Sequence, residues 1–159
     1  MQLKGRGGFF GALSALFKEE KTLLVRPPYA ALNETFDACK TCEAMCVVAC
    51  EEKIIRLDGH KTPFLDFKTT GCSDCHKCLD VCTPNVLNDP QRFISGHAKI
   101  SMTSCMSHHE TICFTCKEPC LENAIVFKGM FHPIILPEKC TGCGYCIAVC
   151  PSAAIEMVA

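Results

Sequence analysis

The sequence predicts an α+β protein in which two similar cysteine-rich modules follow a helical N-terminal extension. Two observations lead to this prediction. All sixteen cysteines of the 159-residue chain fall into four consecutive quartets, and a recurring pattern of apolar residues follows each quartet. The chain has no tryptophan and only two tyrosines. A chain with so few large core residues needs metal to remain compact.

The quartets differ slightly in spacing. In chain order they are Cys39, Cys42, Cys46 and Cys50; Cys72, Cys75, Cys78 and Cys82; Cys105, Cys113, Cys116 and Cys120; and Cys140, Cys143, Cys146 and Cys150. The second and fourth read C-x2-C-x2-C-x3-C, which places three thiolates around one [4Fe–4S] cube and sends the fourth elsewhere. The first has an extra residue before its third cysteine, and the third has a longer first gap. The sequence therefore predicts up to four [4Fe–4S] clusters.

Two other uses of cysteine compete with this interpretation. A disulfide scaffold would require a secreted chain, and the N-terminus offers only a weak secretory signal. Cysteines that recur every few residues on one loop also have poor geometry for disulfides. Structural zinc usually joins two separated C-x2-C knuckles, whereas these cysteines are crowded into single loops. The spacing favours iron–sulfur clusters over both alternatives, and the irregular third quartet is the best remaining candidate for zinc.

In two-cluster ferredoxins the fourth cysteine of each quartet binds the neighbouring cluster. Applied to this chain, that rule predicts four crossed ligand sets. They are Cys39, Cys42, Cys46 with Cys82; Cys72, Cys75, Cys78 with Cys50; Cys105, Cys113, Cys116 with Cys150; and Cys140, Cys143, Cys146 with Cys120. The gap between the second and third quartets is of similar length to the others, so spacing alone leaves a different grouping open.

The repeat defines the predicted modules. Apolar residues occupy the fourth and fifth positions after each fourth cysteine: Ile54 and Ile55, Val86 and Leu87, Ala124 and Ile125, and Ala154 and Ile155. We expect a short helical turn there, leading into a short strand. Turn residues at Asp58-Gly59 and Lys128-Gly129 predict hairpins. The predicted domains are an extension (1–30), a first ferredoxin-type module (31–90) and a second (91–159), each module with two clusters.

The N-terminal extension has its own pattern. Five apolar residues fall at helical spacing and predict an amphipathic helix: Phe9, Phe10, Leu13, Leu16 and Phe17. Such a helix either packs back onto the protein or docks on a partner or a membrane surface. The following Arg26-Pro27-Pro28 segment is predicted to be extended and to help in docking. No stretch reaches transmembrane length, which leaves only peripheral membrane contact open.

Charge and motif content narrow the function. The formal net charge is −1 with both signs interspersed, which predicts no nucleic-acid partner. No nucleophile–base set, phosphate-binding glycine loop or paired carboxylate motif stands out, so we predict a protein that is not an enzyme. His76, His108 and His109 lie within or between the quartets and are predicted to be loop residues. The alternative is that these histidines tune the reduction potential of a cluster or belong to a labile site.

The order of the quartets resembles that of the NapF family, ferredoxin-type accessory proteins of periplasmic nitrate reductase systems. The resemblance covers nearly the whole chain, including the stretched third quartet, C-x7-C-x2-C-x3-C. Its motifs are RPPY at residues 26–29, CSDCHKCLDVC in the second quartet, CFTCKEPCLENAIVF in the third and CTGCGYCIAVCPSAAI in the fourth. The extra residue between Cys42 and Cys46 departs from the family pattern.

This resemblance implies a cytoplasmic iron–sulfur protein that interacts with the catalytic nitrate reductase subunit NapA. It implies that the clusters help that subunit to mature before export, by cluster loading or redox activation. The alternative is a general electron-transfer ferredoxin that relays electrons between a dehydrogenase and a reductase. Labile clusters favour the first function, and four stable clusters within tunnelling reach favour the second.

Overall fold

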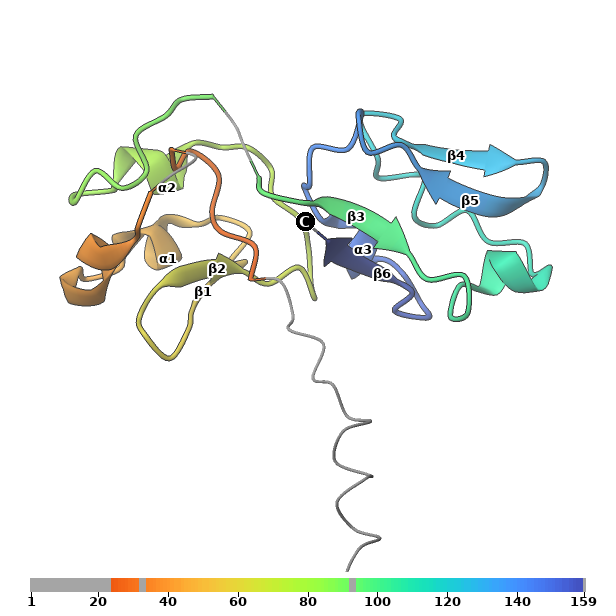
Figure 1. The fold of residues 1–159 in the computed structure, drawn as a ribbon, viewed down its shortest axis with the longest axis horizontal. Helices are drawn as coiled ribbons and strands as arrows, with labels where there is room; N and C mark the ends of the chain where they lie inside the picture. Colours follow the sequence, from red (N-terminus) through yellow and green to blue (C-terminus); the bar gives the residue numbers. More distant parts are fainter. Residues whose placement is uncertain (1–23, 32–33, 92–93, 159) are drawn as a thin grey trace, which may run out of the picture.

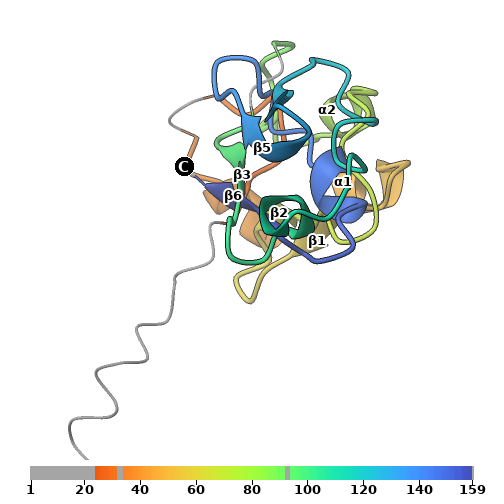
Figure 2. The ribbon, with the colours of Figure 1, turned by 90° about the vertical axis from the view of Figure 1, so that its right-hand side faces the viewer.

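The chain forms two halves that lie side by side along the long axis of the molecule, each with two quartets (Figure 1). The computed structural model describes residues 24–31, 34–91 and 94–158. The predicted N-terminal helix, with its apolar face from Phe9 to Phe17, lies outside the described residues. In the described ranges, no helix is long and apolar enough to cross a membrane. Figure 2 looks along the long axis from the second half, so that the halves overlap.

The first half contains short helices and one hairpin. Its elements are η1 (Asp37–Thr41), α1 (Met45–Ala49), β1 (Ile55–Leu57), β2 (Pro63–Leu65) and α2 (Lys77–Asp80). Strands β1 and β2 pair antiparallel, with Ile55 opposite Leu65. A single antiparallel bridge between Ala30 and Leu87 joins the beginning of this half to its end.

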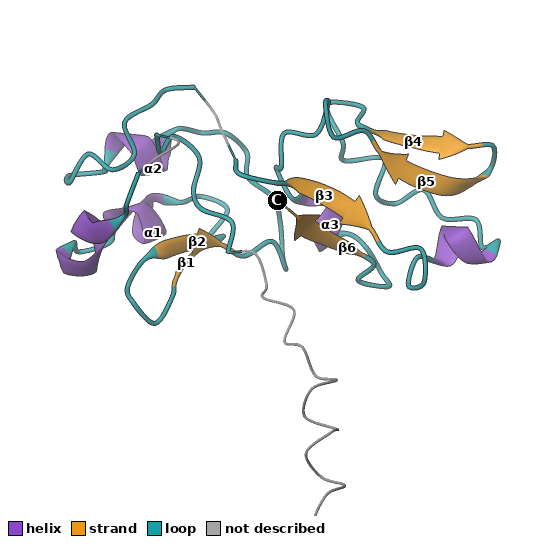
Figure 3. Cartoon of the chain, viewed as in Figure 1, coloured by secondary structure: helices purple, strands orange, loops and turns teal. Residues whose placement is uncertain are grey.

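The second half repeats this plan with longer strands. Its elements are β3 (His97–Ile100), η2 (Met106–His109), β4 (Ile125–Lys128), β5 (Phe131–Ile135), α3 (Tyr145–Ala148) and β6 (Ile155–Val158). Strands β4 and β5 form an antiparallel hairpin, and β3 pairs antiparallel with β6. The β3–β6 pair occupies the place that the Ala30–Leu87 bridge has in the first half. Loops make up most of the remaining chain (Figure 3).

Equivalent hydrogen bonds show that the two halves share one backbone plan. The Asp66 N–H donates to the Ile54 carbonyl at 2.8 Å, and the Leu136 N–H donates to the Ala124 carbonyl at 2.8 Å. Both predicted hairpins are present, at Asp58-Gly59 and Lys128-Gly129. The prediction of a helical turn after each fourth cysteine is wrong. A non-helical turn follows each of these cysteines, and the helices α1, α2 and α3 lie before the fourth cysteines of their quartets.

The apolar pairs that repeat after each quartet form the centre of the core. All eight residues are buried: Ile54, Ile55, Val86, Leu87, Ala124, Ile125, Ala154 and Ile155. They belong to or adjoin two core clusters, one in each half, and Ile147 and Met157 pack against both clusters. The repeat seen in the sequence is therefore the set of side chains that lie beneath the cysteine loops.

The Arg26–Tyr29 segment is part of the core, which corrects the prediction that it helps in docking. Pro27, Pro28 and Tyr29 are fully buried. The Arg26 guanidinium donates to the Pro63 carbonyl at 2.9 Å and pairs with Asp58 at 3.3 Å. The predicted domain boundary after residue 30 therefore falls within a segment that packs against the first half.

A matched pair of valines tests this account of the core. Val86 is 3% exposed and Val48 is 77% exposed. We expect Val86→Ala to destabilise the anaerobic holoprotein by about 2 kcal/mol, because it removes buried methyl groups and leaves a cavity. Val48→Ala should change stability by no more than about 0.5 kcal/mol. Thermal unfolding followed by circular dichroism measures both, and equal melting temperatures for the two variants would contradict the assignment.

Candidate metal centres

Each of four cavities brings together three cysteines of one quartet and the fourth cysteine of the other quartet in the same half; the cavity of site 4 is also lined by Cys72 of the first half. Site 1 is lined by Cys39, Cys42, Cys46 and Cys82; site 2 by Cys72, Cys75, Cys78 and Cys50; site 3 by Cys105, Cys113, Cys116 and Cys150; and site 4 by Cys140, Cys143, Cys146 and Cys120. This is the crossed grouping that the exchange of fourth cysteines predicts. That these cysteines bind clusters stays a prediction.

The third cysteine of each quartet has a strongly raised pKa. Burial is the main cause, followed by the charges of neighbouring cysteines. It raises the pKa of the Cys46 and Cys116 thiols to about 11 and that of the Cys78 and Cys146 thiols to about 12. The protein alone therefore disfavours these thiolates, and a bound cation is what would stabilise them.

The causes of these raised pKa values show that the two quartets of each half lie close together. Among the charges that raise the pKa of each deep thiol is the fourth cysteine of the other quartet. The pairs are Cys82 with Cys46, Cys50 with Cys78, Cys150 with Cys116, and Cys120 with Cys146. The crossed grouping thus appears in the electrostatics as well as in the cavity walls.

One backbone turn places the fourth cysteine in every quartet. The residue three positions later has a positive φ, and its N–H donates to the cysteine carbonyl; these residues are Lys53, Asn85, Asn123 and Ala153. In three quartets a following N–H then donates to the cysteine Sγ at 3.3 Å: Leu87 to Cys82, Ala124 to Cys120 and Ala154 to Cys150. Such hydrogen bonds stabilise sulfur ligands and help to set a cluster's reduction potential.

A second positive-φ residue starts each of the three helices. Ala44, His76 and Gly144 precede α1, α2 and α3, each two residues before the third cysteine of its quartet. This geometry explains how the first quartet accommodates its extra residue. Glu43 is added before Ala44, so the approach to Cys46 is unchanged and all four cysteines still line site 1.

In the insertion of the third quartet, Met106 lines site 3, and the two histidines contact backbone and side-chain groups outside the quartet. The insertion forms η2, where the His108 Nε2 lies 3.2 Å from the Pro133 carbonyl and His108 Nδ1 lies 3.3 Å from His132 Nδ1. The His109 Nε2 lies 2.9 Å from the Thr103 carbonyl. Cys105 and Cys113, on either side of the insertion, line site 3 together.

Site 2 contains a residue that the sequence analysis did not assign to any centre. Tyr29 lines this cavity beside His76, and the two rings stack with their centroids 4.8 Å apart. The Tyr29 hydroxyl donates to Asp74, and burial together with this hydrogen bond raises the pKa of Tyr29 above its usual range. The RPPY motif contains Tyr29, but local spacing gives no indication that it reaches the second quartet.

The geometry of the cysteines fits iron–sulfur cubes. None of the sixteen cysteines, all of which lie in the described ranges, forms a disulfide, which contradicts the disulfide alternative. Across the described ranges, no three His, Cys, Asp or Glu side chains converge closely enough to hold one metal ion. A zinc site would bring four ligands to about 2.0–2.3 Å from a single centre. In a cube each thiolate binds a different iron, so the more widely spaced sulfurs of these cavities suit a [4Fe–4S] cluster.

Comparison with known proteins decides the family. The 4Fe-4S binding domain family matches residues 133–156, which contain the fourth quartet. The chain is 31% identical to the ferredoxin-type protein NapF of Escherichia coli strain K12, over 82% of each chain. It is 33% identical to the NapF of Haemophilus influenzae, over 94% of this chain and 89% of the relative.

The chain belongs to the NapF family. It is therefore a ferredoxin-type protein that binds [4Fe–4S] clusters. A more distant similarity extends to the methylamine utilization ferredoxin-type protein MauM of Methylorubrum extorquens. That relative is 32% identical over 86% of this chain and 71% of its own length.

The crossed sets of this NapF-family protein can be tested by exchanging single fourth cysteines. In anaerobic holoprotein, thiols that bind iron should resist alkylation. We expect Cys82→Ser to expose Cys39, Cys42 and Cys46 to alkylation, because Cys82 lines their cavity. Cys50→Ser should instead expose the other three cysteines of site 2. Mass spectrometry of the alkylated peptides shows which cysteines have lost their protection from alkylation. If only cysteines of the mutated quartet lose protection, the crossed assignment is contradicted.

The raised thiol pKa values also predict the pH dependence of cluster retention. In cluster-free protein the deep thiols, such as Cys78 with a pKa of about 12, hold their protons throughout the neutral range. Binding must displace these protons, so cluster affinity rises with pH and falls on acidification. We expect faster loss of visible cluster absorbance as the pH falls below neutral under anaerobic conditions. A loss rate independent of pH would contradict this argument.

Proposed function

We propose that this protein is an iron–sulfur accessory protein of a nitrate reductase, with up to four [4Fe–4S] clusters in sites 1–4. The observation that carries the proposal is the crossed grouping of all sixteen cysteines around four cavities. The ligands are the four cysteines of each site. When bound, the clusters supply one-electron redox chemistry. The protein supplies thiolates, amide donors and a shaped enclosure for each of them.

We further propose that each half is a bicluster ferredoxin-type module. The equivalent hairpins and the equivalent hydrogen bonds of the two halves support this division. The burial of Val25 and Tyr29 favours a first module that begins at residue 24 rather than 31. The second module then begins after the loop at residue 91.

The surface beside the sites supports a function that requires docking. Several large apolar side chains are exposed next to cysteines. They include Met45 and Val48 on α1, Ile112 before Cys113, Phe114 after it, and Leu121 directly after Cys120, which is 85% exposed. Apolar residues exposed beside a redox centre are typical of a surface that a partner covers. The NapF resemblance supports the catalytic nitrate reductase subunit as that partner, held in the cytoplasm before export.

A relay between other enzymes is the second candidate function. The observation that favours it is that sites 2 and 4 adjoin, because Cys72 lines the cavities of both. The two functions differ in what leaves the protein. Cluster loading transfers iron to the client, whereas redox activation and electron relay transfer only electrons.

The test is to mix anaerobic protein, loaded with isotopically labelled iron, with the cluster-free catalytic subunit. We expect nitrate reductase activity to rise, with labelled iron in the re-isolated client if clusters are loaded and without it if activation is redox. Because Cys143 and Cys146 line site 4, a Cys143→Ala/Cys146→Ala variant should produce a smaller rise in nitrate reductase activity. Leu121→Ser, which leaves all cysteines in place, should weaken binding while retaining iron and sulfide. No activation by the loaded protein, together with electron delivery to an unrelated reductase, would favour the relay.

A further inference from the structure

We infer that the contact between sites 2 and 4 is an electron junction that joins the four centres in one path, in the order 1–2–4–3. The inference rests on the proposed occupancy of the sites by [4Fe–4S] clusters. The inference concerns the boundary between the two halves, where the cysteine loops of site 2 and site 4 meet.

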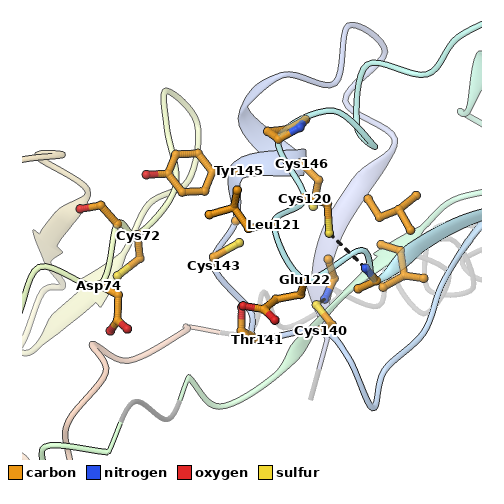
Figure 4. Close-up of a pocket in the computed structure, with 17 residues that line it drawn as sticks. Cys72, Asp74, Cys120, Leu121, Glu122, Cys140, Thr141, Cys143, Tyr145 and Cys146 are labelled. Carbon is orange, nitrogen blue, oxygen red and sulfur yellow. Dashed lines mark hydrogen bonds between the residues drawn. The ribbon is translucent and has the colours of Figure 1, made fainter.

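The two sites meet through the backbone of their own cysteines. The Cys72 N–H, in site 2, donates to the Cys143 carbonyl, in site 4, at 2.7 Å. Cys72 and its neighbour Asp74 also line the cavity of site 4, beside Cys143 (Figure 4). One hydrogen bond therefore connects a ligand residue of one centre to a ligand residue of the other, and no further residue lies in that connection.

Glycines permit this close approach from both sides. A Cβ on Gly71 would lie 2.6 Å from the Cys143 carbonyl oxygen and 2.6 Å from Tyr145. Gly144, on the other half, has a φ of +82°, and a Cβ there would lie 2.2 Å from the Phe67 ring. A larger residue at position 71 would therefore force the two cysteine loops apart, and one at position 144 would displace the Phe67 ring. Because electron tunnelling decreases steeply with distance, the separation of these loops decides whether the halves exchange electrons.

A further contact between side chains spans the same boundary. The Tyr145 hydroxyl donates to Glu52 at 3.5 Å. Ile147, which belongs to α3 of the second half, packs against the core cluster of the first half. The junction is therefore a packed interface rather than a single touching point.

Packing within each half gives the rest of the order. Cys46 of site 1 lies on α1 and Cys78 of site 2 on α2; these two helices contact each other, and both cysteines pack in the core cluster of the first half. Cys116 of site 3 and Cys146 of site 4 are both buried in the core cluster of the second half. Sites 2 and 4 are thus central, and sites 1 and 3 lie at the two ends of the path.

The transfer at the junction involves one electron and no atoms. The cysteines of sites 1–4 would hold clusters that each accept or release one electron. An electron supplied by an external one-electron reductant at site 1 or site 3 would pass to the neighbouring central site, which would be reduced as its donor is oxidised, and then across the junction. No bond would form or break, and no proton would be required. Either end of the protein could therefore release the electron that the other end accepts.

The experiment isolates the two central clusters in the full-length chain. Cys42→Ala and Cys113→Ala together remove one ligand each from sites 1 and 3. We expect the dithionite-reduced double variant to hold the two central clusters and to show an EPR spectrum split by magnetic interaction between them. Adding Gly71→Ala should weaken the splitting, because the new Cβ would push the two cysteine loops apart. Adding Gly59→Ala, where nothing lies within 4 Å of a new Cβ, should preserve it.

Two unsplit signals in the double variant, with iron and sulfide for two clusters, would overturn the junction while leaving the proposed clusters intact. Splitting of undiminished size with Gly71→Ala would also overturn it. If the double variant does not load, the glycine variants are compared in the otherwise unaltered chain. There Gly71→Ala should weaken the interaction between the halves, and spectra identical to those of Gly59→Ala would reject the junction. An unaltered chain without sulfide would instead reject the proposed function itself.

Discussion

The structure depends on one constraint, the crossing of each fourth cysteine into the cavity of the neighbouring quartet. Cys82 lies with the first quartet and Cys50 with the second, so neither site of a half can be complete without the other. Occupied by clusters, the crossed sites would hold together chain segments that share only a small apolar core. Much of the folding free energy would then be cluster-binding free energy. The short strands, with three to five residues each, are consistent with a fold that does not rely on extended sheets.

The turn after the fourth cysteine connects the site to the core. Its backbone directs an N–H at the sulfur, as Ala124 does at Cys120 and Ala154 at Cys150. The same turn sends the side chains at the fourth and fifth positions into the interior, where they are buried. Burial and sulfur hydrogen bonding are thus two results of one local conformation. This is why a pattern of apolar residues, visible in the sequence, marks the places where the centres are built.

What could be predicted from the sequence is what short-range spacing determines. The quartets, the hairpins at Asp58-Gly59 and Lys128-Gly129, and the buried pairs depend on a few consecutive residues, and all are found in the structure. The burial of Pro27 and Tyr29 depends instead on contacts of their segment with β2 and the second quartet, which are distant in sequence. Local spacing therefore predicts a docking segment where the structure has part of the core. The sequence also predicts a helical turn after each fourth cysteine, which the structure does not have. The residue three positions after the cysteine has a positive φ, which a helix does not allow, and neither Lys53 nor Ala153 is a residue type that indicates such a conformation.

A cluster protein must protect its centres from water and yet make them accessible to a partner. In this chain, different residues of each quartet serve these two needs. The third cysteine of each quartet, a proposed ligand, is buried in three quartets and partly buried in the first, which limits the access of water and acid to its sulfur. The residues beside the outer cysteines, such as Ile112 and Leu121, are apolar and exposed. A partner that covers them would exclude water from the same edge of the site and strengthen the electrostatic coupling across it, because charges interact more strongly at low dielectric. Under the proposed function, docking would therefore also strengthen the electrostatic interactions of the cluster, and this would link the exposed surface to the chemistry beneath it.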